Sequence, residues 1–347
     1  MELKYLTEAW KRGADFLGTR YAILCGAMTW VSESNLVSAI SNEGGFGVLA
    51  GGNMPPELLA KEIEATRRKT RFPFGVNLIT VAPNFKDHIE VVVREKAPFV
   101  FFAGSIPSGR DIEQAKASGA KVICFAPVLS LAKRLIKQGT DALVIEGNEA
   151  GGHIGPVATS VLAQEFLLTV TEVPIFVAGG IGTGEMIAQY LSLGAAGAQL
   201  GTRFVVAEEC VAHPRFKEAF IKAQARDAMP TSQFDPSLPT IPVRAILNEG
   251  SKDFNRLQLE LLNKVKSGEI SREEGQVKLE EFWVGALRRA VIDGDVERGS
   301  LMAGQSVAFV KKVQPVREII EELVTGAERK LEEMANGRPP AIGQLCP

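Results

Sequence analysis

The segment EGNEAGGHIG, which begins at Glu146, combines side chains that can move protons with a flexible backbone. It follows the apolar run ALVI, which is typical of a buried strand. Its glycines allow the chain to bend sharply and to approach a ligand closely. Histidine changes charge near neutral pH, so we predict that His153 is a general acid or base. We expect Glu146 and Glu149 to lie near it, with Glu146 alternatively orienting backbone amides of the loop.

The other two histidines have simpler explanations. His213 directly precedes a proline, and His88 lies in the first turn of a predicted surface helix. We predict structural roles for both.

Two further glycine-rich segments have the composition of an anion site. VAGGIGTG contains Gly179 and Gly180 after one apolar run, and the next apolar run is followed by Gly201 and Thr202. Glycine amides and a helix N-terminus can surround a phosphate, and the threonine adds a hydroxyl donor. The alternative is that these glycines only make tight strand-to-helix turns.

Small and amide side chains follow two earlier apolar runs. Gly26, Ala27 and Met28 leave room for a flat ring beside the backbone, or else form a packed rim. Asn77 can hydrogen-bond a polar ring edge or a carbonyl, or have a structural role. The segment DGDVERGSLMAGQ ends at Gln305 and either closes over a ligand or simply connects helices.

The fold has to position these residues. From about residue 20 to 205 the sequence alternates between apolar runs, which predict strands, and helical patterns. The strands are apolar without alternation, which is typical of a parallel sheet covered on both faces. We predict strands at 22–24, 47–50, 74–78, 99–102, 121–125, 142–145, 175–178 and 197–200. Helices are predicted at 35–42, 56–68, 85–95, 111–117, 130–138, 158–170, 185–193 and directly after Gly201.

Eight such units predict an α/β fold, a (β/α)8 TIM barrel, whose active site lies at the carboxyl ends of the strands. A doubly wound open sheet is the alternative. The strand count favours the barrel, and no G-x-G-x-x-G sequence opens the first unit.

We predict four parts along the chain. Residues 1–207 form the barrel, and residues 208–304 form a helical C-terminal lobe over its mouth, in which strands largely vanish and helices break near Ser267-Gly268. Residues 305–334 form closing helices that pack on the barrel. Residues 335–347 form a flexible tail.

Composition excludes several classes of function. With 347 residues and a net charge of −2, the chain has no electrostatic attraction to nucleic acid or to an anionic membrane. Its four cysteines lie far apart with no C-x-x-C pair, which argues against a metal site and a disulfide framework. The N-terminus does not have the composition of a signal peptide, and the apolar stretch near residues 21–31 is too short to cross a bilayer. We expect a cytoplasmic protein without a metal.

The residues alone predict that a phosphate-bearing ligand binds in the barrel mouth beside a histidine. A flat redox cofactor such as FMN fits this description, and so does a sugar-phosphate substrate of an isomerase or aldolase.

Several motifs together resemble a known family over roughly residues 20–330. They are Gly26-Ala-Met, Gly44-Gly-Phe-Gly, Pro73-Phe-Gly-Val-Asn, the Glu146 segment, Ala178-Gly-Gly-Ile and Leu200-Gly-Thr-Arg-Phe. The set resembles the FMN-dependent nitronate monooxygenases (2-nitropropane dioxygenases) and enoyl-ACP reductase II. Gly51-Gly-Asn53 and the segments 285–290 and 299–305 resemble the reductase more closely.

The resemblance implies a flavin-dependent oxidoreductase that takes electrons from NADH or NADPH. FMN would contact Gly26, Ala27, Met28, Asn77, Glu146, Gly151, Gly152, Gly179, Gly180, Gln199, Gly201, Thr202, Met302 and Gln305. His153 would supply a proton during reduction of a trans-2-enoyl thioester on acyl carrier protein, in fatty-acid synthesis. The alternatives are a nitronate monooxygenase, in which His153 is a base on a small nitronate, and an NADH:quinone reductase. Relatives of this kind lead us to expect a homodimer.

Overall fold

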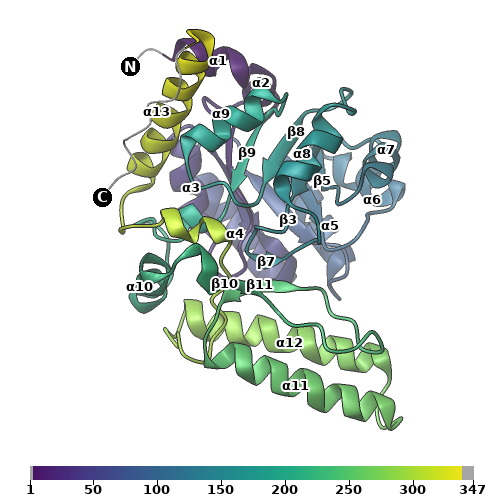
Figure 1. The fold of residues 1–347 in the computed structure, drawn as a ribbon. Helices are drawn as coiled ribbons and strands as arrows, with labels where there is room; N and C mark the ends of the chain where they lie inside the picture. The colour runs from purple at the N-terminus through teal and green to yellow at the C-terminus, as the bar shows by residue number, and fades with distance from the viewer. Residues whose placement is uncertain (1–2, 338–347) are drawn as a thin grey trace.

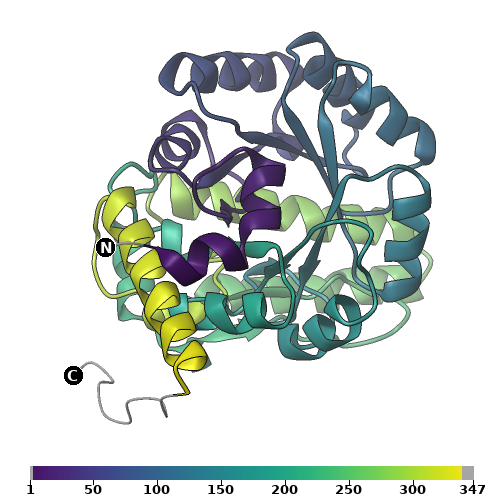
Figure 2. The ribbon, with the colours of Figure 1, turned by 90° about the horizontal axis from the view of Figure 1, so that it is seen from above.

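A computed structural model describes residues 3–337, which contain a closed barrel of eight parallel strands. The strands follow one another around the barrel in chain order, and Figures 1 and 2 show them surrounded by helices. They are β1 (Ile23–Cys25), β2 (Phe46–Ala50), β3 (Gly75–Ile79), β4 (Phe99–Ala103), β5 (Lys121–Phe125), β6 (Ala142–Glu146), β8 (Ile175–Ala178) and β9 (Gly197–Leu200). The predicted (β/α)8 TIM barrel is confirmed.

Seven helices lie between consecutive barrel strands. They are α3 (Ser34–Asn42), α4 (Pro56–Lys69), α5 (Phe85–Arg94), α6 (Gly109–Lys116), α7 (Leu129–Lys137), α8 (Thr159–Leu167) and α9 (Gly184–Ser192). Local sequence begins several of them: the hydroxyl of Ser108 accepts a bond from the amide of Asp111 at the start of α6, and Thr183 caps α9 in the same way. Each matches a predicted helix to within a few residues.

Directly after Gly201, where we predicted a helix, the structure has a single 3-10 turn and not an α-helix. A short 3-10 helix, Thr202–Phe204, follows β9, and the next α-helix is α10 (Pro214–Lys222). The eighth position of the outer ring is filled by α13 (Val316–Ala335), which packs against α9 on one side and α3 on the other. Gly184 permits this contact, because a Cβ there would lie 2.0 Å from the carbonyl oxygen of Leu323.

The amino ends of the strands are closed by α1 (Lys4–Ala9) and α2 (Lys11–Leu17), for which we predicted no helices. The ring of Phe16 lies 5.8 Å from that of Phe99 and 6.2 Å from that of Phe176. The ammonium group of Lys121 lies 4.6 Å from the centre of the Phe16 ring. This aromatic plug fills the bottom of the barrel, so a ligand has to enter at the opposite end.

A second unit extends from the barrel below β7 (Gly152–His153) in Figure 1. An antiparallel hairpin of α11 (Glu249–Lys266) and α12 (Arg272–Val291) encloses a small apolar core that includes Phe254, Leu261 and Trp283. The hairpin turns at Ser267-Gly268, where we predicted the break, and Gly268 has a φ of +77°.

Strands largely vanish between residues 208 and 304, as expected, but two short ones that we did not predict remain there. A three-stranded sheet joins the hairpin to the barrel in the order β10 (Ala228–Pro230), β11 (Val243–Ile246) and β7 (Gly152–His153). These strands are short and paired across distant parts of the chain, so no local pattern indicated them. The boundaries proposed for the four parts remain predictions.

The segment from residue 305 to the end of α13 begins with a 3-10 helix, Gln305–Phe309. The predicted tail, 335–347, starts at the last residue of α13, and its residues 338–347 lie outside the described part. Within residues 3–337, no helix has both the length and the apolarity that a bilayer crossing requires. The same residues contain no cluster of His, Cys, Asp and Glu suited to a metal ion.

Candidate active site

The floor of the barrel mouth consists of small residues with three polar side chains among them. A Cβ on Gly75 would lie 2.5 Å from the Phe101 ring, so Gly75 faces the interior of the barrel. Asn77 lies two residues further along the same strand and therefore faces the interior too, nearer the mouth. Register places Gln199 beside Ala178 and Ala178 beside Glu146. Alternation therefore directs Asn77, Glu146 and Gln199 into the same mouth.

Two carboxamides in this floor are unpaired and buried. Asn77 is 8% exposed and Gln199 is 7% exposed, yet neither side chain makes a hydrogen bond within residues 3–337. A carboxamide that has no partner in the protein is free to bond a ligand. Gly26 brings the backbone of the first strand close to the same place, since a Cβ there would lie 3.0 Å from Nε2 of Gln199.

The carboxyl group of Glu146 lies at the end of β6. Burial raises the pKa of Glu146 to about 7. The described residues provide no hydrogen-bond partner for this carboxyl, so it does not orient the amides of its loop as our alternative prediction supposed.

Glu149 has that orienting role instead. Its carboxylate accepts hydrogen bonds from the backbone N–H of Thr159 at 2.8 Å and from the Thr159 hydroxyl at 2.7 Å. The bond fixes the start of α8 to the loop after β6. A Cβ on Gly180, whose φ is +72°, would lie 3.1 Å from Cβ of Glu149, so the loop after β8 packs on the same carboxylate side chain.

The predicted anion cradle is brought together by the pairing of β8 with β9. Gly179 and Gly180 both have positive φ, and Gly201 and Thr202 follow the neighbouring strand. Among the described residues, no acceptor receives the N–H groups of Gly179, Gly180, Gly201 or Thr202. Unpaired amides that converge from two loops are suited to a phosphate. The cradle rests on loop amides and not, as we expected, on the N-terminus of an α-helix.

The segment with Met302 and Gln305 folds back onto the mouth. The N–H of Gly304 donates to Oγ1 of Thr202 at 3.0 Å, and the N–H of Gln305 donates to the carbonyl of Glu149 at 2.9 Å. A Cβ on Gly151 would lie 2.6 Å from the backbone nitrogen of Gly304, so this glycine is required by the contact. The tertiary structure thus unites the loops after β6 and β9 with a segment about a hundred residues away in sequence.

The loop after β1 completes the rim. Ala27 and Met28 are partly buried, and the hydroxyl of Ser32 holds the loop by accepting from the N–H of Met28 at 3.0 Å and donating to the carbonyl of Gly26 at 3.0 Å. A Cβ on Gly201 would lie 3.3 Å from the sulfur of Met28, so this rim contacts the anion cradle.

His153 lies in β7, at the edge of the small sheet. Its Nε2 is 3.0 Å from Oε2 of Glu280 on α12, and both side chains are about half exposed. No hydrogen bond joins His153 to Glu146 or Glu149 among the described residues, so their expected proximity stays a prediction. The remaining histidines match their structural interpretations: the ring of His88 bonds the carbonyl of Met54, and His213 caps α10.

Sequence reasoning missed two buried arginines that support the site. Arg244 on β11 donates to the carbonyl of Asn148 at 2.9 Å and thereby holds the loop that carries Glu149. Arg203 follows Thr202 and pairs with Glu322 on α13. Both partners are distant in sequence, and an isolated arginine carries no local signal of this role.

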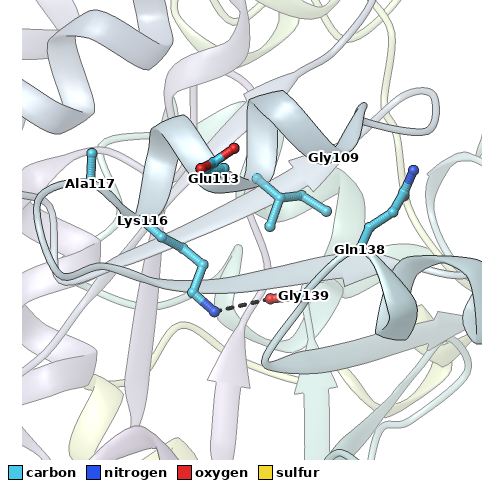
Figure 3. A pocket seen from close by; sticks show the side chains of 7 residues that line it. Gly109, Glu113, Lys116, Ala117, Gln138 and Gly139 are labelled. Atoms are coloured by element: carbon cyan, nitrogen blue, oxygen red, sulfur yellow. Dashed lines mark hydrogen bonds between the residues drawn. The ribbon is translucent and has the colours of Figure 1, made fainter.

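A shallow surface hollow between α6 and the turn after α7 is a less suitable site (Figure 3). It lies on the outer helical layer and contains no predicted site residue. Two charged side chains, Glu113 and Lys116, line it, and Lys116 already donates to the carbonyl of Gly139 at 3.0 Å and pairs with Asp141.

The residues of the mouth fit FMN. Unpaired loop amides suit its phosphate, the small residues of the floor leave room for a flat ring, and two unpaired buried carboxamides suit the polar edge of that ring.

Comparison with known proteins shows what the whole chain resembles. A sequence model of the nitronate monooxygenase family matches residues 11–88 and 79–326. A Mycobacterium tuberculosis protein named (3aS,4S,5R,7aS)-5-hydroxy-7a-methyl-1-oxo-octahydro-1H-indene-4-carboxyl-CoA dehydrogenase is 30% identical over 342 residues, which cover 92% of this chain and 96% of that protein. A probable nitronate monooxygenase of Staphylococcus aureus (strain Newman) is 26% identical, over 90% of this chain and 96% of its own length.

Among solved structures, FabK from Thermotoga maritima is similar over almost the whole chain. It is 36% identical, with a TM-score of 0.84, and the match covers 94% of this chain and 98% of FabK.

Proposed function

Because this chain belongs to the nitronate monooxygenase family, a family of FMN-dependent flavoproteins, we propose that it is an enoyl-ACP reductase of type II. The chain is an enzyme, a flavin-dependent oxidoreductase. The finer proposal is that NADH or NADPH reduces its flavin and that a trans-2-enoyl thioester on acyl carrier protein is the acceptor. We propose that it works in the cytoplasm, in fatty-acid synthesis, as a homodimer.

The observation that carries the proposal is the match to FabK, an enoyl-ACP reductase II, over nearly the full length of both chains. The sequence segments 285–290 and 299–305, around Met302 and Gln305, also resemble the reductase. The Mycobacterium tuberculosis relative is named for a carboxyl-CoA compound, and a CoA thioester shares its reactive group with an acyl carrier protein thioester.

The chain's own residues suggest how such an enzyme is arranged. The amides of Gly180, Gly201 and Thr202 would bind the phosphate of FMN, and the carboxamides of Asn77 and Gln199 would bind its ring. FMN, when bound, supplies hydride transfer between the nicotinamide and the thioester. The Gly304 segment and α12 would exclude water from the mouth. His153 would hold the proton that the α-carbon of the thioester receives.

Nitronate oxidation is the second candidate, because the family model and the Staphylococcus aureus relative carry that name. The same imidazole could remove the proton from the carbon next to a nitro group. NADH:quinone reduction is a third activity of the same kind.

One pair of assays separates these candidates. We expect the purified protein to be yellow and to oxidise NADH or NADPH under nitrogen only when crotonyl-CoA or crotonyl-ACP is added. Oxygen consumption with propionate 3-nitronate, without any reduction of enoyl thioesters, would replace the reductase by the monooxygenase. A colourless protein that cannot be reconstituted with FMN would overturn both.

A further inference from the structure

The interaction between His153 and Glu280 joins the two parts of the molecule. His153 belongs to the loop after β6, and Glu280 belongs to α12 in the helical hairpin. Nε2 of the imidazole lies 3.0 Å from Oε2 of the carboxylate. Neither group has another hydrogen-bond partner among the described residues.

The chemistry of the pair determines which ring nitrogen carries hydrogen. A carboxylate accepts hydrogen bonds and has none to donate, so Nε2 of His153 has to be the donor. A neutral imidazole has one N–H, which leaves Nδ1 with a free lone pair. When the ring gains a proton, that proton is on Nδ1.

The backbone on both sides of the pair is held in place. His153 pairs with Val243 of β11, and the N–H of Ile154 donates to the carbonyl of Pro242 at 2.9 Å. Glu280 lies on a twenty-residue helix whose inner face packs through Leu279 and Trp283. A fixed backbone on each side allows the carboxylate to select one orientation of the ring.

We propose that Glu280 is a positioning residue that holds His153 as the Nε2–H tautomer, so that Nδ1 is the nitrogen that exchanges a proton with substrate. The catalytic role of His153 rests on the proposed function. The tautomer of His153 does not rest on it, because the tautomer is measured separately from turnover.

The first experiment measures the tautomer in the FMN-loaded enzyme with ¹⁵N-labelled histidine. The chain has three histidines, and His153→Ala identifies the relevant signals in a long-range ¹H–¹⁵N spectrum. We expect Nε2–H in the wild type at alkaline pH, a mixture of tautomers in Glu280→Ala, and an unchanged spectrum in Glu281→Ala. Glu281 is the matched control because it is the next residue on the same helix, is exposed, and makes no bond to His153. An Nδ1–H tautomer in the wild type would overturn the proposal.

The second experiment measures kcat, KM and flavin content. We expect Glu280→Ala to lower kcat by about 10-fold to 100-fold, the usual effect of losing such a supporting partner, with flavin content and KM for NADH unchanged. Glu280→Gln should recover part of kcat, because its carboxamide oxygen still accepts from Nε2 without the charge. If Glu280→Ala lowers the melting temperature but leaves kcat at the wild-type value, the pair is only a structural link and the proposal fails.

The two experiments separate the two hypotheses. If the wild type reduces no enoyl thioester but has the expected tautomer, the proposed function fails, and the inference is then tested on kcat with a nitronate. If the enzyme reduces enoyl thioesters and Glu280→Ala changes neither tautomer nor kcat, only the inference fails.

Discussion

The N–H of Gly304 donates a hydrogen bond of 3.0 Å to the hydroxyl oxygen of Thr202, 102 residues earlier in the chain. The bond is buried and connects the segment that covers the mouth to the loop after the last barrel strand. Thr202 therefore serves two purposes: its hydroxyl oxygen holds the covering segment, and its backbone amide is part of the predicted phosphate site.

Replacing Thr202 by alanine tests this double role. The change leaves the buried N–H of Gly304 without an acceptor, which costs about 1 kcal/mol, and it loosens the cradle. We expect a lower melting temperature and weaker FMN binding, measured by flavin fluorescence on titration of the apoprotein. Thr202→Ser retains the hydroxyl and should bind FMN normally. FMN affinity that is unchanged in Thr202→Ala would place the phosphate elsewhere.

His153→Ala should retain flavin and lose turnover. A positioned acid or base usually contributes about 10²-fold or more to the rate, and His153 has no contact with the phosphate loops. The measurement is kcat together with the visible spectrum of the bound flavin. His213→Ala is the control, because His213 only caps α10. Turnover within twofold of the wild type would give His153 a structural role.

The two unpaired carboxamides should contribute to cofactor binding. We expect Asn77→Ala and Gln199→Ala each to weaken FMN binding by about tenfold, which corresponds to the loss of about 1.4 kcal/mol in a ligand hydrogen bond. In the absence of FMN, neither substitution removes a hydrogen bond, because neither amide has a partner in the described structure. We therefore expect no loss of stability from that cause. Calorimetric titration of the apoprotein with FMN measures the change, and an unchanged affinity in both variants would remove these residues from the site.

Glu146 should make stability depend on pH. Burial raises its pKa from 4.5 to about 7, so the folded protein binds a proton more tightly than the unfolded chain does. The resulting stabilisation is complete below pH 4.5 and is lost as pH rises to about 7. We expect the stability of Glu146→Gln, relative to the wild type, to increase over this interval. Unfolding midpoints of the two apoproteins across that pH range provide the measurement, and a constant difference would contradict the shift.

Gly180 and Gly119 form a matched pair for testing the loop after β8. Both have positive φ, but a Cβ on Gly180 meets Cβ of Glu149 at 3.1 Å, whereas a Cβ on Gly119 meets nothing within 4 Å. Gly119→Ala should lower the free energy of unfolding by about 1 kcal/mol, because alanine is strained in the left-handed conformation. Gly180→Ala should cost more and should also weaken FMN binding. Equal losses of stability, with FMN binding unchanged, would mean that the loop does not form the cradle.

The sequence determined the barrel because its information is local. Apolar runs such as ALVI before Glu146 form the barrel strands, and their predicted bounds differ from the structure by at most one residue at each end. Glycines after β8 and β9 indicated the loops in which amides are left free. The regular topology of the barrel then placed both loops at the same end, without knowledge of any particular contact.

Only the tertiary structure determined the partners of the site residues. The pairing of His153 with Glu280, the bond from Gly304 to Thr202 and the hold of Arg244 on Asn148 each join residues far apart in sequence. Such contacts depend on how a lobe and a closing segment pack against the barrel, and packing of distant surfaces leaves no periodic pattern in the chain. The short strands β10 and β11 were not predictable for the same reason. Nor was the position of α13, which takes the place of the eighth barrel helix. Each of these elements is stabilised by partners that local sequence does not specify.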